Sequence, residues 1–158
     1  MSVPWPLFLF LIGAVSARVA VVAPRSELEH VIIADCKSPS GFESSQYAYY
    51  SGPVDGTPDI TTNVRVGKQQ PWFGKGLIKA TFADNTTFSC NFPVSVSEGQ
   101  FIGNGFRGSV EDYDRGWSSL SCYARFRAAL YSNEDGSVCN AIYDCDHSTP
   151  PGEWLSQV

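Results

Sequence analysis

The most reactive side chains in this sequence are five cysteines, two of which lie six positions apart in "GSVCNAIYDC", residues 136–145. Structural zinc sites usually pair cysteines two to four residues apart and repeat that pair elsewhere in the chain, which this sequence does not do. Side chains around Cys139 and Cys145 alternate in character, and this predicts a strand with both cysteines on one face. The spacing therefore favours disulfides to other strands over a metal site.

The strands that carry the cysteines suggest how they pair. Cys36 ends the first predicted strand, "HVIIADC", and Cys145 ends the last, so a Cys36–Cys145 disulfide would tie the two ends of the domain together. Cys122 would then pair with Cys139 near the final hairpin, which leaves Cys90 as a buried free thiol. Sequence alone does not fix this pairing, and other pairings remain open.

The candidate catalytic groups of the sequence are its two histidines and a cluster of carboxylates. His30 and His147 lie in no motif for nucleophilic catalysis, and we expect both at the surface. Acidic residues concentrate in "SVEDYDRGW", residues 109–117. Because glycoside hydrolysis needs two carboxylates, this segment could form a sugar cleft, and its candidate residues are Glu111, Asp112, Asp114 and Trp117. Adjacent charges flanked by glycine are also typical of a solvated loop, which we favour.

Two short motifs indicate surface positions. In "PWFGKG", Trp72 and Phe73 lie between Pro71 and Gly74, so proline and glycine rather than burial set the chain direction. We predict that both aromatic side chains are exposed and contact a ligand or partner. The sequence "NTT" makes Asn85 a predicted N-glycosylation site in a polar turn. No metal and no cofactor are predicted.

The N-terminal segment predicts the compartment. Residues 1–17, "MSVPWPLFLFLIGAVSA", combine an apolar stretch with small residues at the end, as in a secretory signal peptide. Arg18 interrupts this stretch too early for a membrane span, which needs about twenty apolar residues. We therefore expect a secreted, extracellular protein without membrane association after cleavage. An oxidising compartment would convert four of the cysteines into two disulfides.

The rest of the chain predicts one β domain. Short alternating or apolar runs are separated by glycine- and proline-rich turns, which favours an all-β, disulfide-stapled antiparallel sandwich or barrel. At most one short helix is expected, in "SCYARFRAALY", residues 121–131. We assign residues 18–29 to a flexible arm or short pro-segment, 30–147 to the single β domain, and 148–158 to an exposed tail.

Overall composition narrows the classes of partner. Charged residues are few (17%), aromatic residues are abundant (13%), and the formal net charge is −5. Such a balance makes the phosphate backbone of nucleic acids an unsuitable partner. We expect a monomer that binds a host protein or a glycan.

Several segments together resemble a group of small secreted proteins of filamentous ascomycete fungi that are often classed as candidate effectors. The resemblance covers about residues 31–145 and includes "ADCKSPSG", "SSQYAYYS", "QPWFGKG", "SLSCY" and "LYSNEDGSVCNAIYDC". It implies export by a fungus, action on a host or competitor, and four framework cysteines at Cys36, Cys122, Cys139 and Cys145. Cys90 departs from that pattern. The resemblance includes no catalytic signature.

These observations lead to two expectations about function. The leading one is a secreted, non-enzymatic, disulfide-stabilised effector-like protein that acts by binding a host or competitor molecule. The alternative is a secreted polysaccharide-binding protein or glycoside hydrolase that uses the loop containing Glu111, Asp112, Asp114 and Trp117.

Overall fold

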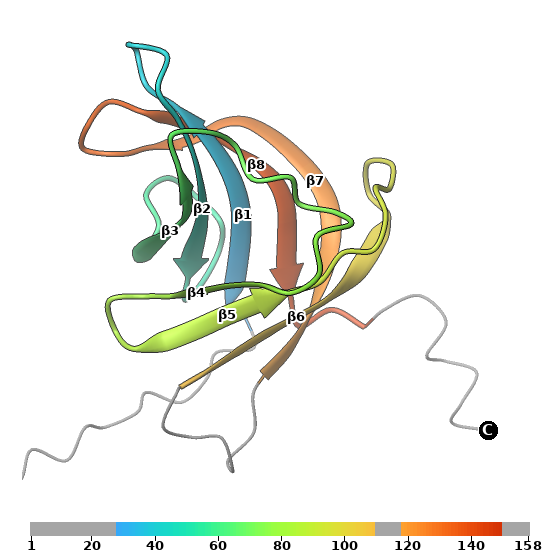
Figure 1. Cartoon of the computed structure of the whole chain (residues 1–158). Helices are drawn as coiled ribbons and strands as arrows, with labels where there is room; N and C mark the ends of the chain where they lie inside the picture. Colours follow the sequence, from blue (N-terminus) through green and yellow to red (C-terminus); the bar gives the residue numbers. More distant parts are fainter. Residues whose placement is uncertain (1–27, 110–117, 150–158) are drawn as a thin grey trace, which may run out of the picture.

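The computed structural model describes residues 28–109 and 118–149 (Figure 1). These residues form eight strands and no helix, so the predicted all-β class is confirmed and residues 121–131 belong to a strand. None of the described residues forms a helix long and apolar enough to span a membrane. The strands are β1 (His30–Lys37), β2 (Glu43–Tyr50), β3 (Ile60–Val66), β4 (Ile78–Thr81), β5 (Thr86–Cys90), β6 (Phe101–Ser109), β7 (Ser118–Ser132) and β8 (Val138–Asp146).

The eight strands make one antiparallel sheet in the order β3-β2-β1-β8-β7-β6-β5-β4. The first and last strands, β1 and β8, are therefore neighbours near its middle, and β3 and β4 form its two edges. The sheet curls so that these edges approach each other (Figure 1). The Thr62 hydroxyl on β3 donates a hydrogen bond to the Thr81 carbonyl on β4 at 2.8 Å. The result is a nearly closed barrel.

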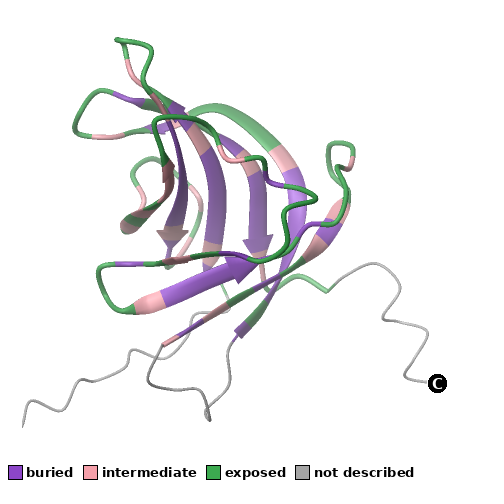
Figure 2. Ribbon diagram, viewed as in Figure 1, coloured by how far each residue is buried: buried purple, intermediate pink, exposed green. Residues whose placement is uncertain are grey.

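Much of the strand ribbon around the barrel is buried (Figure 2). Packed side chains fill the interior, as is usual for eight strands. Its largest fully buried members are Tyr47, Phe88, Phe92, Ile33 and Leu120. A Cβ added at Gly105 on β6 would lie 2.2 Å from the Phe88 ring, so packing permits only glycine there.

A second apolar cluster covers the outer face of the sheet. Side chains alternate between the two faces along β1, so Val31 and Ile33 lie inside the barrel whereas Ile32 and Ala34 join the outer cluster. The segment 51–59 packs over this cluster, and the Tyr50 hydroxyl donates to the Gly56 carbonyl at 2.9 Å. Strands β1 and β2 are consequently buried on both faces.

Each disulfide joins two residues that face each other on neighbouring strands. Cys36 on β1 pairs with Cys139 on β8, and Cys122 on β7 pairs with Cys145 on β8. The expected Cys36–Cys145 and Cys122–Cys139 pairing is therefore wrong, although the same four cysteines are used. Cys90 remains a buried free thiol.

A β-bulge in β8 explains the difference in pairing. The register with β1 passes from Ile33–Tyr143 to Ala34–Ala141, so Ile142 is an extra residue on β8. One extra residue reverses the alternation of side chains between faces. Cys139 therefore belongs to the outer cluster and Cys145 to the barrel interior. The prediction that both cysteines share a face is wrong for this reason.

Candidate functional site

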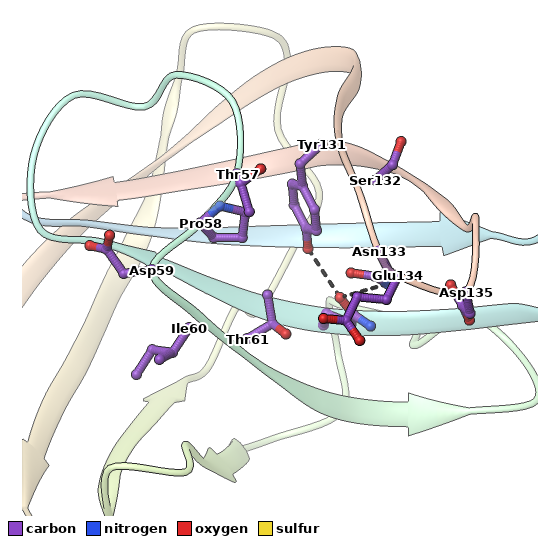
Figure 3. A pocket seen from close by; sticks show the side chains of 11 residues that line it. Thr57, Pro58, Asp59, Ile60, Thr61, Tyr131, Ser132, Asn133, Glu134 and Asp135 are labelled. Atoms are coloured by element: carbon purple, nitrogen blue, oxygen red, sulfur yellow. Dashed lines mark hydrogen bonds between the residues drawn. The ribbon is translucent and has the colours of Figure 1, made fainter.

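A polar cleft of about 420 Å³ lies on the outer side of β2 and β3 (Figure 3). One wall is formed by residues 57–61, which lead into β3, and the other by residues 131–135, at the turn from β7 to β8. Gln46 on β2 lines the cleft between them and is only 7% exposed. Three segments that are distant in sequence thus build one open site.

Hydrogen bonds fix the Gln46 side chain in this cleft. The Tyr131 hydroxyl donates to Gln46 Oε1 at 3.2 Å, and Asn133 Nδ2 donates to the same oxygen at 3.3 Å (Figure 3). Gln46 Nε2 in turn donates to Asn63 Oδ1 at 2.9 Å. Because both ends of the amide are engaged, the inner side of the cleft is rigid before any ligand arrives.

The charged side chains that line the cleft are all acidic, namely Asp59, Glu134 and Asp135. Hydrogen bonds from Ser51 hold the pKa of Asp59 below its usual range, and those from Ser137 do the same for the pKa of Asp135. Both carboxyl groups therefore stay ionised in mildly acidic as well as neutral solution. The cleft is suited to ligands that donate hydrogen bonds.

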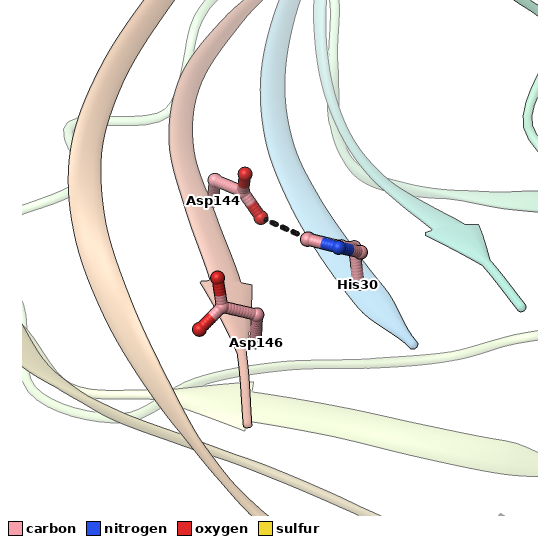
Figure 4. A group of neighbouring side chains, drawn as sticks. All are labelled: His30, Asp144 and Asp146. Carbon is pink, nitrogen blue, oxygen red and sulfur yellow. Dashed lines mark hydrogen bonds and ion pairs between the residues drawn. The ribbon is translucent and has the colours of Figure 1, made fainter. Parts of the chain in front are cut away.

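A second group of titratable side chains lies on the outer face of β1 and β8 (Figure 4). His30 Nδ1 lies 2.8 Å from Oδ1 of the buried Asp144, and ligand atoms of His30, Asp144 and Asp146 lie within 4.8 Å of one another. Arg125 Nη1 is 3.1 Å from Asp144 Oδ2 and 3.3 Å from Asp146 Oδ2. Arg127 Nη2 lies 3.9 Å from Asp144 Oδ2, so two guanidinium groups offset the two carboxylates and would repel a metal ion. The group therefore acts as an ion-pair network.

A third group fills one end of the barrel. The fully buried Glu29 accepts hydrogen bonds through Oε2 from the Tyr49 hydroxyl at 3.1 Å and from Arg107 Nη1 at 3.2 Å. Its Oε1 lies 3.0 Å from His147 Nε2. Glu29, the last residue of the predicted flexible arm, is thus firmly held. The expectation of surface histidines is wrong for His30, which is partly buried against Asp144, whereas His147 is an exposed residue although its ring contacts Glu29.

The two aromatic residues of the segment "PWFGKG" differ in burial. Trp72 is 4% exposed, and its Nε1 donates to Asp35 Oδ1 at 3.0 Å inside the barrel. Its ring centroid lies 5.8 Å from that of Tyr47. The prediction that Trp72 is exposed is therefore wrong, because the indole completes the core where the chain crosses from β3 to β4. Phe73, by contrast, is 48% exposed.

The other predicted site residues are partly within and partly outside the described residues. Cys90 is buried with its sulfur 3.4 Å from the Tyr47 hydroxyl, and burial raises the pKa of its thiol to about 12, which makes it a poor nucleophile. Asn85 is exposed at the turn between β4 and β5, and its glycosylation stays a prediction. The proposed sugar-cleft residues, Glu111, Asp112, Asp114 and Trp117, lie outside the described residues, as does the predicted signal peptide 1–17.

Comparisons of the chain with protein-family models, curated proteins and solved structures found no match. Function must therefore be inferred from the geometry of these sites. Sequence reasoning missed the polar cleft because no motif links Gln46 to the two segments that wall it. The only local signal was the density of turn residues in 51–59 and 133–136.

Proposed function

We propose that this chain is a secreted, disulfide-stabilised, effector-like protein that binds a host or competitor molecule and catalyses no reaction. The observation that carries this proposal is the polar cleft, in which a fixed amide and acidic side chains line an open space on the surface. The barrel interior holds packed side chains, so a ligand would bind outside it. Two buried disulfides suit an extracellular environment.

The chemistry of the cleft favours a ligand rich in hydrogen-bond donors. Carboxylates of Asp59, Glu134 and Asp135 only accept hydrogen bonds when ionised, and the hydroxyls of Thr57 and Thr61 can donate or accept. The volume falls within the range of small-molecule sites. Either an ammonium group on a host protein or the hydroxyls of a glycan would satisfy these acceptors.

Polysaccharide binding is the second candidate function. It is favoured by the mixture of carboxylate, amide and hydroxyl groups in the cleft, because sugar hydroxyls both donate and accept hydrogen bonds. Apolar surface from Pro58 and Ile60 lies beside these polar groups and could contact the C–H face of a sugar ring. The hydrolase form of this candidate rests instead on Glu111 and Asp114.

The test is a variant that fills the cleft. Thr61→Arg places a large cationic side chain among the acidic groups, and Ser119→Arg places the same side chain at an exposed position on β7. The exported protein would be applied to a glycan array and to immobilised lysine- and arginine-rich peptides. We expect binding to one of these that Thr61→Arg abolishes and Ser119→Arg retains. Binding that survives Thr61→Arg would show that the cleft is not the site.

Export and catalysis are tested separately. N-terminal sequencing of protein recovered from the medium should begin at Arg18 if residues 1–17 are removed. A hydrolysis screen on cell-wall polymers should give no turnover. Turnover that Glu111→Gln or Asp114→Asn abolishes would overturn the non-enzymatic proposal in favour of a glycoside hydrolase.

A further inference from the structure

One region of the chain is basic, although the net charge of the whole chain is negative. Residues 60–83 carry four of the eleven lysine and arginine residues and none of the sixteen acidic ones. Residues 85–97, which follow the turn at Asp84, carry no charged side chain at all. Asp84 itself lies 3.5 Å from Arg107, at the turn between β4 and β5. Positive charge is therefore concentrated in residues 60–83 of the sequence.

Large apolar side chains are exposed in the same region. Phe73 is 48% exposed, Leu77 66% and Val94 60%. The segments that carry them run side by side, because Phe73 forms a backbone bridge with Phe92 and Ile78 pairs with Cys90. The loop between β3 and β4, residues 67–77, also carries Lys68 and Lys75, both exposed. We call residues 67–77 the basic loop.

The basic loop is fixed to the barrel at three points. Trp72 is buried and bonded to Asp35, the Gln70 amide donates to Ser45 Oγ at 2.7 Å, and the Gly74 amide donates to the Phe92 carbonyl at 2.8 Å. These anchors hold the backbone on both sides of Phe73, so little ordering is needed when a partner binds. Such preorganisation lowers the entropic cost of association.

We infer that the basic loop docks on an anionic lipid bilayer. Lysine side chains are attracted to anionic headgroups, and exposed phenylalanine and leucine side chains enter the interface between headgroups and acyl chains. An anionic polysaccharide would satisfy Lys68 and Lys75 but would offer no apolar environment to Phe73 and Leu77. This pairing of charge with exposed apolar area selects the lipid surface, although no membrane association was expected after cleavage of the predicted signal peptide.

Vesicle sedimentation tests this inference with the purified full-length exported protein. Phosphatidylcholine vesicles with and without phosphatidylserine would be compared at low and physiological salt. We expect binding only to vesicles that contain phosphatidylserine, and weaker binding as salt rises. Lys68→Gln/Lys75→Gln and Phe73→Ala/Leu77→Ala should each lower the partition coefficient on the order of tenfold.

Matched variants outside the basic loop serve as controls. Phe126→Ala removes a side chain that is 56% exposed on β7, and Lys37→Gln removes an exposed cation from β1. Both should bind phosphatidylserine vesicles as the parent does. The inference fails if the parent does not sediment at low salt, or if the controls lose as much binding as the basic-loop variants. The inference also fails if Phe73→Ala/Leu77→Ala leaves vesicle binding unchanged. It fails too if this double substitution converts a dimer that buries the basic loop into monomers.

Discussion

The two halves of the barrel are stabilised differently. Strands β1, β2, β7 and β8, here called the cystine half, contain both disulfides, and β1 and β2 are buried on both faces. Strands β3 to β6, the open half, contain no disulfide, and β3 alternates between partly buried and exposed positions. The edges at β3 and β4 meet through the Thr62–Thr81 hydrogen bond. Stability is therefore concentrated in one half, and local opening should begin at the β3 and β4 edges.

Removing the disulfides of the cystine half should lower the free energy of unfolding the most. The Cys36–Cys139 disulfide spans 103 residues and the Cys122–Cys145 disulfide 23, so loop entropy favours the first. Cys36→Ala/Cys139→Ala should lower the free energy of unfolding by about 4–5 kcal/mol, and Cys122→Ala/Cys145→Ala by about 3 kcal/mol. Chemical denaturation measures both values.

The same experiment has a chemical control. Peptide mapping under non-reducing conditions should recover Cys36 linked to Cys139 and Cys122 linked to Cys145. A peptide that joins Cys36 to Cys145 would show that the disulfides form across different strands. Equal losses of stability in the two double variants would contradict the loop-entropy ranking.

The open half depends on its buried aromatic anchor instead. Trp72→Ala removes a core side chain and the hydrogen bond to Asp35, and should lower the free energy of unfolding by about 3–5 kcal/mol. Phe73→Ala, at the neighbouring exposed position, should change it by no more than about 0.5 kcal/mol. Thermal melting of both variants checks this contrast. Similar losses in the two would mean that Phe73 is also packed.

A smaller effect is expected at Gly105 in the open half, where an added side chain would clash with Phe88. The Cβ of Gly105→Ala would lie 2.2 Å from the Phe88 ring and 3.2 Å from Cys122 Sγ. Overpacking of this kind should cost about 1–3 kcal/mol. Gly52→Ala is the matched control, because its Cβ would meet nothing within 4 Å. A Gly105→Ala variant as stable as the parent would indicate that the open half rearranges around Phe88 at little cost.

The smallest change in stability should come from pH, through His30 in the cystine half. The hydrogen bond with Asp144 raises the pKa of His30 above its usual 6.5. The folded state therefore holds the proton more tightly, and this stabilisation is complete below about pH 6.5 and is lost as pH rises through the higher folded pKa. The melting temperature should fall by a few degrees between about pH 6 and pH 8. His30→Gln should flatten that part of the profile, and an unchanged profile would exclude His30 as its source.

Much of the fold followed from local sequence patterns. Alternating apolar residues predicted a first strand that ends at Cys36, and the structure places β1 at His30–Lys37. The glycines of β6 are typical of a loop, so the local pattern does not indicate this strand. The structure shows that one of them, Gly105, is glycine because Phe88 occupies the space beside it.

The failed predictions depend on tertiary structure. Nothing local marks Ile142 as a bulge, so the alternation around Cys139 and Cys145 gave the wrong faces and hence the wrong partners. Proline and glycine around Trp72 correctly indicated a turn but could not show that the turn crosses the barrel. The polar cleft forms only when the curved sheet brings Gln46 beside residues that are distant in sequence.

The arrangement of β1 beside β8 also has a kinetic consequence. Six of the seven strand pairs join consecutive strands, which can form as local hairpins. The β1–β8 pair must instead close a loop of about a hundred residues, and such long-range contacts form slowly. Folding should therefore proceed from hairpins to a late seam between the first and last strands. The Cys36–Cys139 disulfide crosses that seam, so its oxidation would report when β1 and β8 pair.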